Sequence, residues 1–149
     1  MVNILKRKLI KNESKLLVEK IKSTPNIIGY SLREWINADH IMVAENDEGK
    51  ILGVCLNYDF HNEWNKIAAL FVIEEFRGKG IGKSLFYASC RDAIARGKNL
   101  YTISANPIVI KMMKDLNFEI IESILSFHQA STKYQLVLYY HSIQWLINL

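Results

Sequence analysis

The chain has 149 residues, of which 50% are hydrophobic, and it carries a formal net charge of +4 at pH 7. A chain of this size matches one ordinary domain and can bury roughly 70% of its unfolded surface, so we expect a single domain over residues 1–149. Its two cysteines, Cys55 and Cys90, are too few for a disulfide scaffold and are not clustered like metal ligands. We therefore expect a reduced, cytoplasmic protein that binds no metal.

The positive charge is concentrated in the first 22 residues, which hold seven Lys or Arg and two acidic residues, whereas the remainder holds twelve and thirteen. A solvated helix face accounts for such a segment, so we expect no specific nucleic-acid partner. A nucleic-acid-binding protein that uses this segment is kept as an alternative. No stretch supplies eighteen uncharged apolar residues, so we expect no membrane partner either.

The first half of the chain predicts two helices followed by three strands. Leu16, Leu17 and Ile21 recur with helical spacing within residues 13–23, and a second short helix is expected at about 30–37. The period then changes to short β-rich runs, separated by the turn sequence NDEGK and by the polar HNEWN. We expect three consecutive antiparallel strands within residues 41–73.

The second half of the chain alternates between helices and strands. Ile81, Leu85 and Ala88 begin an amphipathic helix that Gly97 ends. The elements expected after it are a strand at 100–104, a helix at 107–116 and two strands at 118–127 and 133–140. The order ααβββαβαββ predicts an α+β fold, a mixed α/β domain of three layers. The apolar C-terminal segment could supply a homodimer contact.

The sequence RGKGIGK, residues 77–83, places three glycines and three basic residues at the entry to that helix. It is not a P-loop, because Arg77 stands where G-x-x-x-x-G-K-[ST] needs its first glycine. The dinucleotide fingerprint G-x-G-x-x-G fails in both registers, since Lys83 and Leu85 occupy the last glycine positions. A simple basic turn needs only one glycine. Bare backbone N–H groups, a helix N-terminus and cations together favour a pyrophosphate site.

The stretch LFVIEEFRGKGIGKSLF, residues 70–86, resembles the acetyl-CoA-binding motif of the GCN5-related N-acetyltransferases (GNAT). That family's signature [RQ]-x-x-G-x-[GA] is met by Arg77, Gly80 and Gly82. The similarity extends over roughly residues 41–140. It implies a mixed, largely antiparallel sheet flanked by helices. In that fold the strand before the loop bulges and splays from the strand after the helix, which leaves a V-shaped cleft for acetyl-CoA.

The resemblance also implies a function. The protein would be an N-acetyltransferase that moves the acetyl group of acetyl-CoA to a primary amine of a small molecule or a protein by direct attack, without a metal. The backbone N–H of Val72, at the expected bulge, would stabilise the oxyanion. The cofactor-binding residues that the motif implies are Leu70, Phe71, Val72, Arg77, Gly78, Lys79, Gly80, Ile81, Gly82, Lys83 and Asn106.

The chain departs from the family pattern on the helix after Asn106. The family's frequent general acid is a tyrosine where this chain has Met113, which cannot donate a proton, and Asn117 replaces a glycine that ends the helix. Asn tolerates the left-handed conformation that this glycine supplies. Three explanations of Met113 stay open. Another residue acts as the acid (Tyr101, Tyr139 or Tyr140), the thiolate leaves unassisted, or the protein is a non-catalytic acyl-CoA-binding or regulatory module.

The sequence YDFHNEWN, residues 58–65, is expected to lie on the acceptor side. His61 and Glu63 are candidates for a base or for acceptor contacts, although a solvated hairpin loop explains them as well. The acidic bias of residues 34–63 favours a cationic amine. Polyamine-like, aminoglycoside-like, amino-acid and protein acceptors all fit, and the sequence does not choose among them.

Overall fold

The computed structural model describes residues 1–24, 29–60 and 62–119. The chain divides into two compact units, residues 1–109 and 110–149, each of which is described by itself. The elements in chain order are β1 (Val2–Lys6), α1 (Lys11–Lys22), α2 (Leu32–Asn37), β2 (His40–Asn46), β3 (Ile51–Phe60), β4 (Trp64–Val72), η1 (Glu74–Phe76), α3 (Ile81–Ala95), β5 (Asn99–Tyr101) and α4 (Pro107–Asp115).

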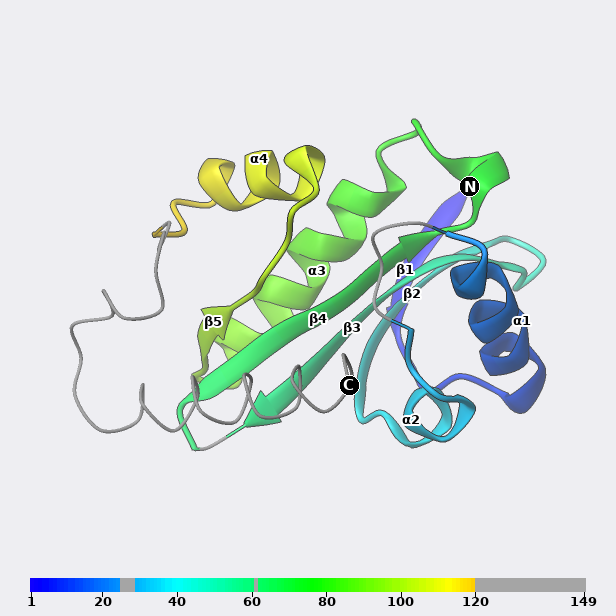
Figure 1. The fold of residues 1–149 in the computed structure, drawn as a ribbon, viewed down its shortest axis with the longest axis horizontal. Helices are drawn as coiled ribbons and strands as arrows, with labels where there is room; N and C mark the ends of the chain where they lie inside the picture. Colours follow the sequence, from blue (N-terminus) through cyan, green and yellow to red (C-terminus); the bar gives the residue numbers. More distant parts are fainter. Residues whose placement is uncertain (25–28, 61, 120–149) are drawn as a thin grey trace, which may run out of the picture. The chain divides into compact units, whose positions relative to one another are not determined.

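Five strands form one sheet in the order β1-β2-β3-β4-β5 (Figure 1). Neighbouring strands from β1 to β4 are antiparallel, and β5 is parallel to β4. The three antiparallel strands expected within residues 41–73 are confirmed as β2, β3 and β4. The sequence did not predict β1, which pairs with β2 so that Ile4 lies opposite Ala44. The mixed, largely antiparallel α/β fold is therefore as expected, with one additional edge strand.

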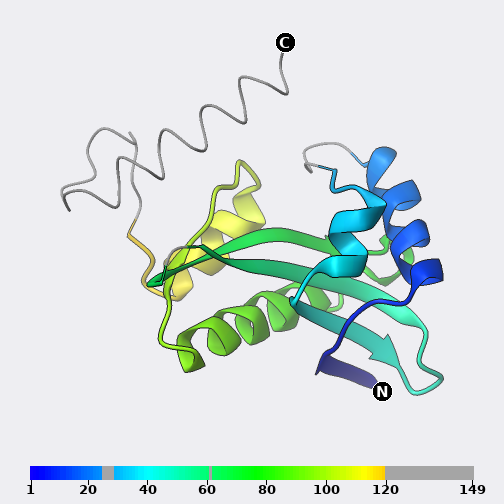
Figure 2. The same ribbon diagram turned by 90° about the horizontal axis from the view of Figure 1, so that it is seen from below.

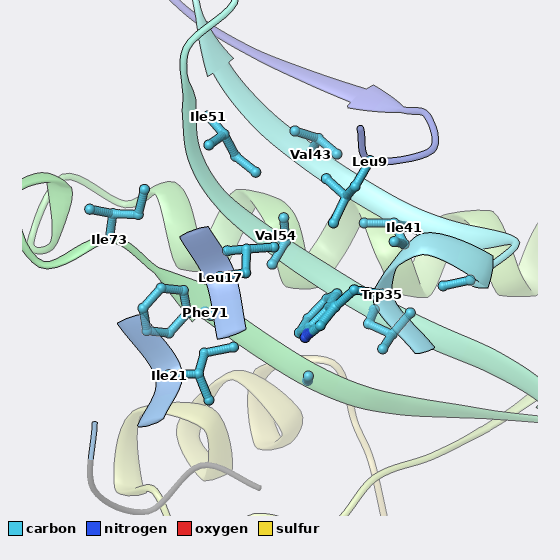
Figure 3. Close-up of a cluster of buried hydrophobic side chains, with 13 residues drawn as sticks. Leu9, Leu17, Ile21, Trp35, Ile41, Val43, Ile51, Val54, Phe71 and Ile73 are labelled. Atoms are coloured by element: carbon cyan, nitrogen blue, oxygen red, sulfur yellow. The ribbon is translucent and has the colours of Figure 1, made fainter. Parts of the chain in front are cut away.

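Helices cover both faces of the sheet, with α1 and α2 on one face and α3 on the other (Figure 2). Strand β2 shows how the sequence builds these layers, because side chains alternate between the two faces of a strand. Ile41 and Val43 belong to the buried cluster that the sheet shares with α1 and α2, which Figure 3 shows around Leu17 and Trp35. Met42, which is also buried, points to the α3 face. The central strands are thus core on both sides, as a three-layer domain requires.

Strands β4 and β5 separate after a short paired stretch. Their pairing joins Trp64–Lys66 to Asn99–Tyr101, so β5 is shorter than the strand expected at 100–104. Just beyond the paired stretch, the Thr102 hydroxyl donates a hydrogen bond to the Ile67 carbonyl oxygen at 3.0 Å. No strand within the described ranges pairs with β4 on this side past that bond. We call this point of separation the fork.

The second unit begins within α4, and its described residues are 110–119. Asn117 has a φ of 57°, and the Phe118 N–H donates to the Met113 carbonyl oxygen at 3.0 Å. This left-handed helix end confirms the expectation for Asn117.

Several sequence-based predictions fall outside the described residues. They are most of the strand at 118–127, the strand at 133–140, the C-terminal homodimer contact, and Tyr139 and Tyr140. Within the ranges that are described, no helix is long and apolar enough to cross a membrane. Cys55 and Cys90 are both free and buried, as expected of core cysteines.

Candidate functional site

The loop between β4 and α3 exposes a series of backbone groups. Gly78 and Gly80 both have a φ of 77°, which L side chains rarely adopt, and a Cβ at either position would meet nothing within 4 Å. Gly80 is also the N-cap of α3 and offers no side chain to cap it. The first N–H groups of a helix have no partner within the helix. These donors therefore point out of the α3 N-terminus without a side-chain cap.

Gly82 differs from the other two glycines because its backbone does not require a glycine. A Cβ at Gly82 would lie 3.5 Å from Cγ2 of Val72, which is an ordinary van der Waals contact. The fold itself would therefore accept a small side chain here. The missing side chain keeps the first turn of α3 clear on the side that faces the end of β4.

Cations surround this loop, which we call the glycine loop (residues 77–83). The Arg77 Nε donates to the Val72 carbonyl oxygen at 2.9 Å, and Lys83 lies 5.4 Å from the centroid of the Tyr87 ring. Lys79 and Lys50 both lie over the Phe76 ring, at 5.7 and 5.6 Å. In the part of the chain that is described, no ion pair involves any of these four cations. Lys50, which comes from the β2–β3 hairpin, was not identified from the sequence.

The edge of β4 is open between the fork and the glycine loop. The Ile73 N–H donates to the Leu52 carbonyl oxygen on β3 at 2.9 Å. Because the bonding direction alternates along a strand, the backbone of Phe71 also faces β3, whereas the backbones of Leu70 and Val72 face the opposite side. Of the three strand-end residues that the sequence singled out, Leu70 and Val72 thus offer their N–H groups to this open edge.

The bulge in β4 does not lie where the sequence placed it. The register of β3 and β4 shifts between Leu56 and Asn57, whose partners are Ala69 and Ile67, so Ala68 is the extra residue. Val72 was expected at the bulge, and in that detail the expectation is wrong, because Val72 lies four residues further along, beside the glycine loop. The register depends on the facing strand, so the motif alone did not reveal it.

Asn106 lies between β5 and α4. Its Oδ1 accepts a hydrogen bond from the Ile108 N–H at 2.9 Å, and its own N–H donates to the Ser104 hydroxyl at 3.1 Å. The side-chain oxygen therefore caps the start of α4. The side-chain amide NH₂ takes no part in this cap. Met113 is a half-buried residue of the second unit.

Several of the acidic residues expected on the acceptor side have partners within the fold. Glu34 accepts a hydrogen bond from the Ser31 N–H at 2.7 Å, and Glu45 pairs with Arg7 at 2.8 Å. Asp47 pairs with the chain's amino group. Glu63 is exposed, and its carbonyl oxygen accepts from the Asn99 N–H, while His61 lies outside the described residues. Pairing with cations therefore offsets the charges of Glu45 and Asp47, whereas Glu34 keeps its charge within electrostatic range of Tyr58.

Asp59 lies on the α3 face of the sheet, where it joins a network of polar side chains. Asn57 donates to the Ser89 hydroxyl at 2.7 Å and accepts from Asn65 at 2.7 Å, and Arg96 donates to Asn57 at 3.1 Å. We call this set the α3 network: Lys6, His40, Asn57, Asp59, Asn65, Ser89, Asp92 and Arg96. Asn57 and Ser89 each interrupt an otherwise apolar run, which is a sequence signal of a buried polar cluster.

The α3 network controls the charge of its carboxylates. Burial by itself would raise the pKa of Asp59, but hydrogen bonds from Arg96 and Asn65 outweigh it and lower the pKa to about 2. Burial, together with the positive charges of Arg96 and Lys6, lowers the pKa of His40. At neutral pH the network therefore holds an ionised Asp59 beside a neutral His40, 3.5 Å from Nε2 to Oδ2. None of these groups lies on the open edge of β4.

Comparisons with known proteins agree with this geometry. The family model described as the acetyltransferase (GNAT) family matches residues 10–118. A mycothiol acetyltransferase of Saccharomonospora viridis is 28% identical over 116 residues, which are 65% of this chain and 35% of that protein. The chain thus spans about a third of the length of this curated relative.

Solved structures share the fold at low sequence identity. A Mycobacterium tuberculosis protein in complex with CoA superimposes with a TM-score of 0.71 at 14% identity, over 88% of this chain and 79% of that chain. N-acetylglutamate synthase of Neisseria gonorrhoeae, complexed with coenzyme A and N-acetyl-glutamate, gives 0.64 at 20% identity, over 76% of this chain and 28% of that chain.

Proposed function

Because this chain belongs to the acetyltransferase (GNAT) family, we propose that it transfers the acetyl group of acetyl-CoA to a primary amine by direct attack. One observation carries the proposal. The uncapped start of α3, with left-handed glycines before it and four cations around it, lies at the end of a strand whose outer edge is open. A phosphate-bearing carrier with a long, hydrogen-bonding arm fits such an arrangement.

In this proposal the pyrophosphate lies over the N–H groups of residues 78–83. Gly78, Gly80 and Gly82 allow it to approach the backbone, and the α3 dipole favours its charge. Arg77, Lys79 and Lys83 would add full positive charges, and the amide group of Asn106 would contact the cofactor near the start of α4.

The pantetheine arm would run along the open edge of β4, towards the fork. The N–H groups of Leu70 and Val72 face this edge and would bind its amide groups. Val72 lies beside the glycine loop, where the arm begins, so the thioester would lie further on, near Ala68. The N–H of Leu70 is then better placed than that of Val72 to stabilise the oxyanion. Phe71 would contribute through its position in the strand and not through its backbone groups.

The chemistry requires a neutral amine and a proton for the leaving group. The amine nitrogen bonds to the thioester carbon, the C–S bond breaks, and the proton that the amine loses ends on the CoA thiol. A thiol has an ordinary pKa of about 8.5, so its thiolate can leave without a strong acid. With Met113 at the family's tyrosine position, slow unassisted departure or a relocated acid such as Tyr101 accounts for the step. His61 and Glu63 stay candidates for the base.

A non-catalytic acyl-CoA-binding or regulatory module is the second candidate, and Met113 is the observation that favours it. Calorimetry with acetyl-CoA, followed by a thiol-release assay with a panel of amines, separates the two. We expect binding and amine-dependent release of free thiol. Binding without release from any amine would support the second candidate, and no binding would contradict both.

A further inference from the structure

Lys50 is an exposed lysine of the β2–β3 hairpin, and the hairpin holds its backbone in place. Its N–H donates to the Asn46 Oδ1 at 2.8 Å, and its carbonyl oxygen accepts from the Asn46 N–H at 3.0 Å. The same Oδ1 atom also accepts from the Glu48 N–H at 3.1 Å. Asn46 thus bonds across the turn and fixes the point from which the Lys50 side chain extends.

Lys50 and Lys79 come from different parts of the chain and meet at one aromatic ring. Their Nζ atoms lie 5.6 and 5.7 Å from the centroid of the Phe76 ring. Phe76 packs against the buried cluster of the domain, so the ring is a fixed support for both side chains. Contacts between an exposed ammonium group and a ring are weak. An anion that contacts both ammonium groups would therefore bind more favourably than the ring does.

The acids near this ring leave the two ammonium groups available. Glu75 faces a lysine of α1 at 3.8 Å, and neither Lys50 nor Lys79 forms an ion pair within the described ranges. Glu48 and Glu74 are exposed and lie close by in the chain, so they reduce the net positive charge of the region. A further anion would therefore be bound by direct contact with the lysines and not by a general positive field.

The proposed course of acetyl-CoA directs its nucleotide towards this end of the sheet. The pantetheine arm would run from the glycine loop towards the fork, and the adenosine part of CoA is joined to the other end of the pyrophosphate. Gly53 on β3 lies opposite Val72 on β4. Lys50 therefore lies about 10 Å beyond the level of Val72, in the direction away from the fork. The β2–β3 hairpin and η1 lie at the end of the sheet where β4 stops (Figure 1).

Resting on the proposed acetyl transfer, we propose that Lys50 is a specificity-determining residue, which binds the 3′-phosphate of CoA together with Lys79 beside the Phe76 ring. A phosphomonoester carries a charge of about −1.5 to −2 at pH 7 and offers three acceptor oxygens, so it can bind two ammonium groups at once. Lysine binds phosphate as a point charge. This suits a side chain that reaches from a hairpin to a ligand lying outside the fold.

Two ligands that differ by this phosphate alone test the proposal. Calorimetry compares CoA with 3′-dephospho-CoA, and we expect wild-type protein to bind CoA about 10-fold more tightly. Lys50→Met removes the charge from a side chain of similar length, so this ratio should fall to about 2, while the affinity for 3′-dephospho-CoA stays unchanged. Lys50→Arg keeps the charge and should keep most of the preference.

Lys15→Met is the matched control. Lys15 is an exposed lysine of α1 that forms no ion pair in the part of the chain that is described, so its loss changes the net charge equally. The ratio of the two affinities should stay at its wild-type value. An acidic residue at Gly49, beside Lys50, should weaken CoA binding in the same direction as Lys50→Met, and far less than an acidic residue in the glycine loop. Thermal unfolding of each variant identifies a folding defect.

Different failures point to different errors. A wild-type ratio of about 1, or a wild-type ratio kept in folded Lys50→Met, would overturn this proposal and leave acetyl transfer intact. Equal losses for both ligands in Lys50→Met would overturn it too, since they would place Lys50 at the pyrophosphate. Wild-type protein that binds neither ligand would overturn the proposed function and this proposal together.

Discussion

The two ends of α3 differ in whether their polar groups are bonded within the fold. At its N-terminus, the helix begins at an uncapped Gly80 and offers its N–H groups outward, among cations that form no ion pair in the described part of the chain. In its C-terminal half and at its C-cap, Ser89, Asp92 and Arg96 bond to side chains of β3 and β1 in the α3 network. Polar groups that are bonded within the fold stabilise it, and those left open can bind a ligand.

Gly80→Asp, at the N-terminus of α3, should have the largest effect, which is a loss of cofactor binding. The aspartate would fill the phosphate position and add like charge, so we expect acetyl-CoA affinity to fall by 100-fold or more, as measured by calorimetry. Gly49→Asp is the matched control, because Gly49 has a φ of 76°, has equally open surroundings and lies in the β2–β3 hairpin. Both variants should lose about 1–2 kcal/mol of folding stability, because a side chain is strained at this φ. Equal affinities in the two variants would contradict the loop assignment.

Asn57→Leu should destabilise the α3 network at the C-terminal end of α3. The substitution removes the Asn57 partner of the buried Ser89 and one of the two acceptors of Asn65, which keeps its hydrogen bond to Asp59. Each such loss in a buried site costs about 1–3 kcal/mol. We expect the free energy of unfolding to fall by about 3 kcal/mol in urea titration, while acetyl-CoA affinity stays unchanged. Asn12→Leu, at an exposed position of α1, should be nearly neutral. A loss of cofactor affinity in the folded Asn57 variant would show that the two ends are coupled.

Acidification should destabilise the α3 network, and the free energy of unfolding should fall in two smaller steps. His40 has a lowered pKa, so the unfolded chain binds its proton first, and stability should fall as the pH drops below about 6.5. Asp59 has its pKa lowered to about 2, so a second loss should begin near pH 4 and continue towards pH 2. Urea midpoints at pH 7.5, 5.5 and 3.0 measure both steps. His40→Gln should remove the first step only; a first step that persists in this variant would assign it to another group.

The glycine loop at the N-terminus of α3 was largely predictable from the sequence, because the residues that form it are close together in the chain. Glycines with positive φ, adjacent cations and a following amphipathic helix all lie within residues 77–83 and the turns beside them. Strand β1 was missed for the opposite reason. It is five residues long, it includes the exposed Val2 and Leu5, and its partner β2 lies about forty residues away. The basic segment also differs from a solvated helix face, since Lys6 and Arg7 bind acids of other elements.

The acceptor side depended on contacts that no single stretch encodes. Asp59 was counted with the acidic residues around it, but its partner Arg96 is 37 positions away. The position of the bulge at Ala68 likewise follows from the register with β3. Local chemistry is therefore readable in the sequence, and the assembly of distant side chains is not.

The hydrogen bond from Thr102 to Ile67 fixes the length of the open edge of β4. It ends the paired part of β4 and β5, while the glycine loop limits the open edge at the other end. With an acyl carrier lying along this edge as proposed, each residue of β4 corresponds to about 3.3 Å of the length of the carrier arm. A carrier arm much shorter than pantetheine would leave its acyl carbon short of the fork. The sheet would then select its acyl donor by the length of the arm, and that length is set by the position at which β4 and β5 separate.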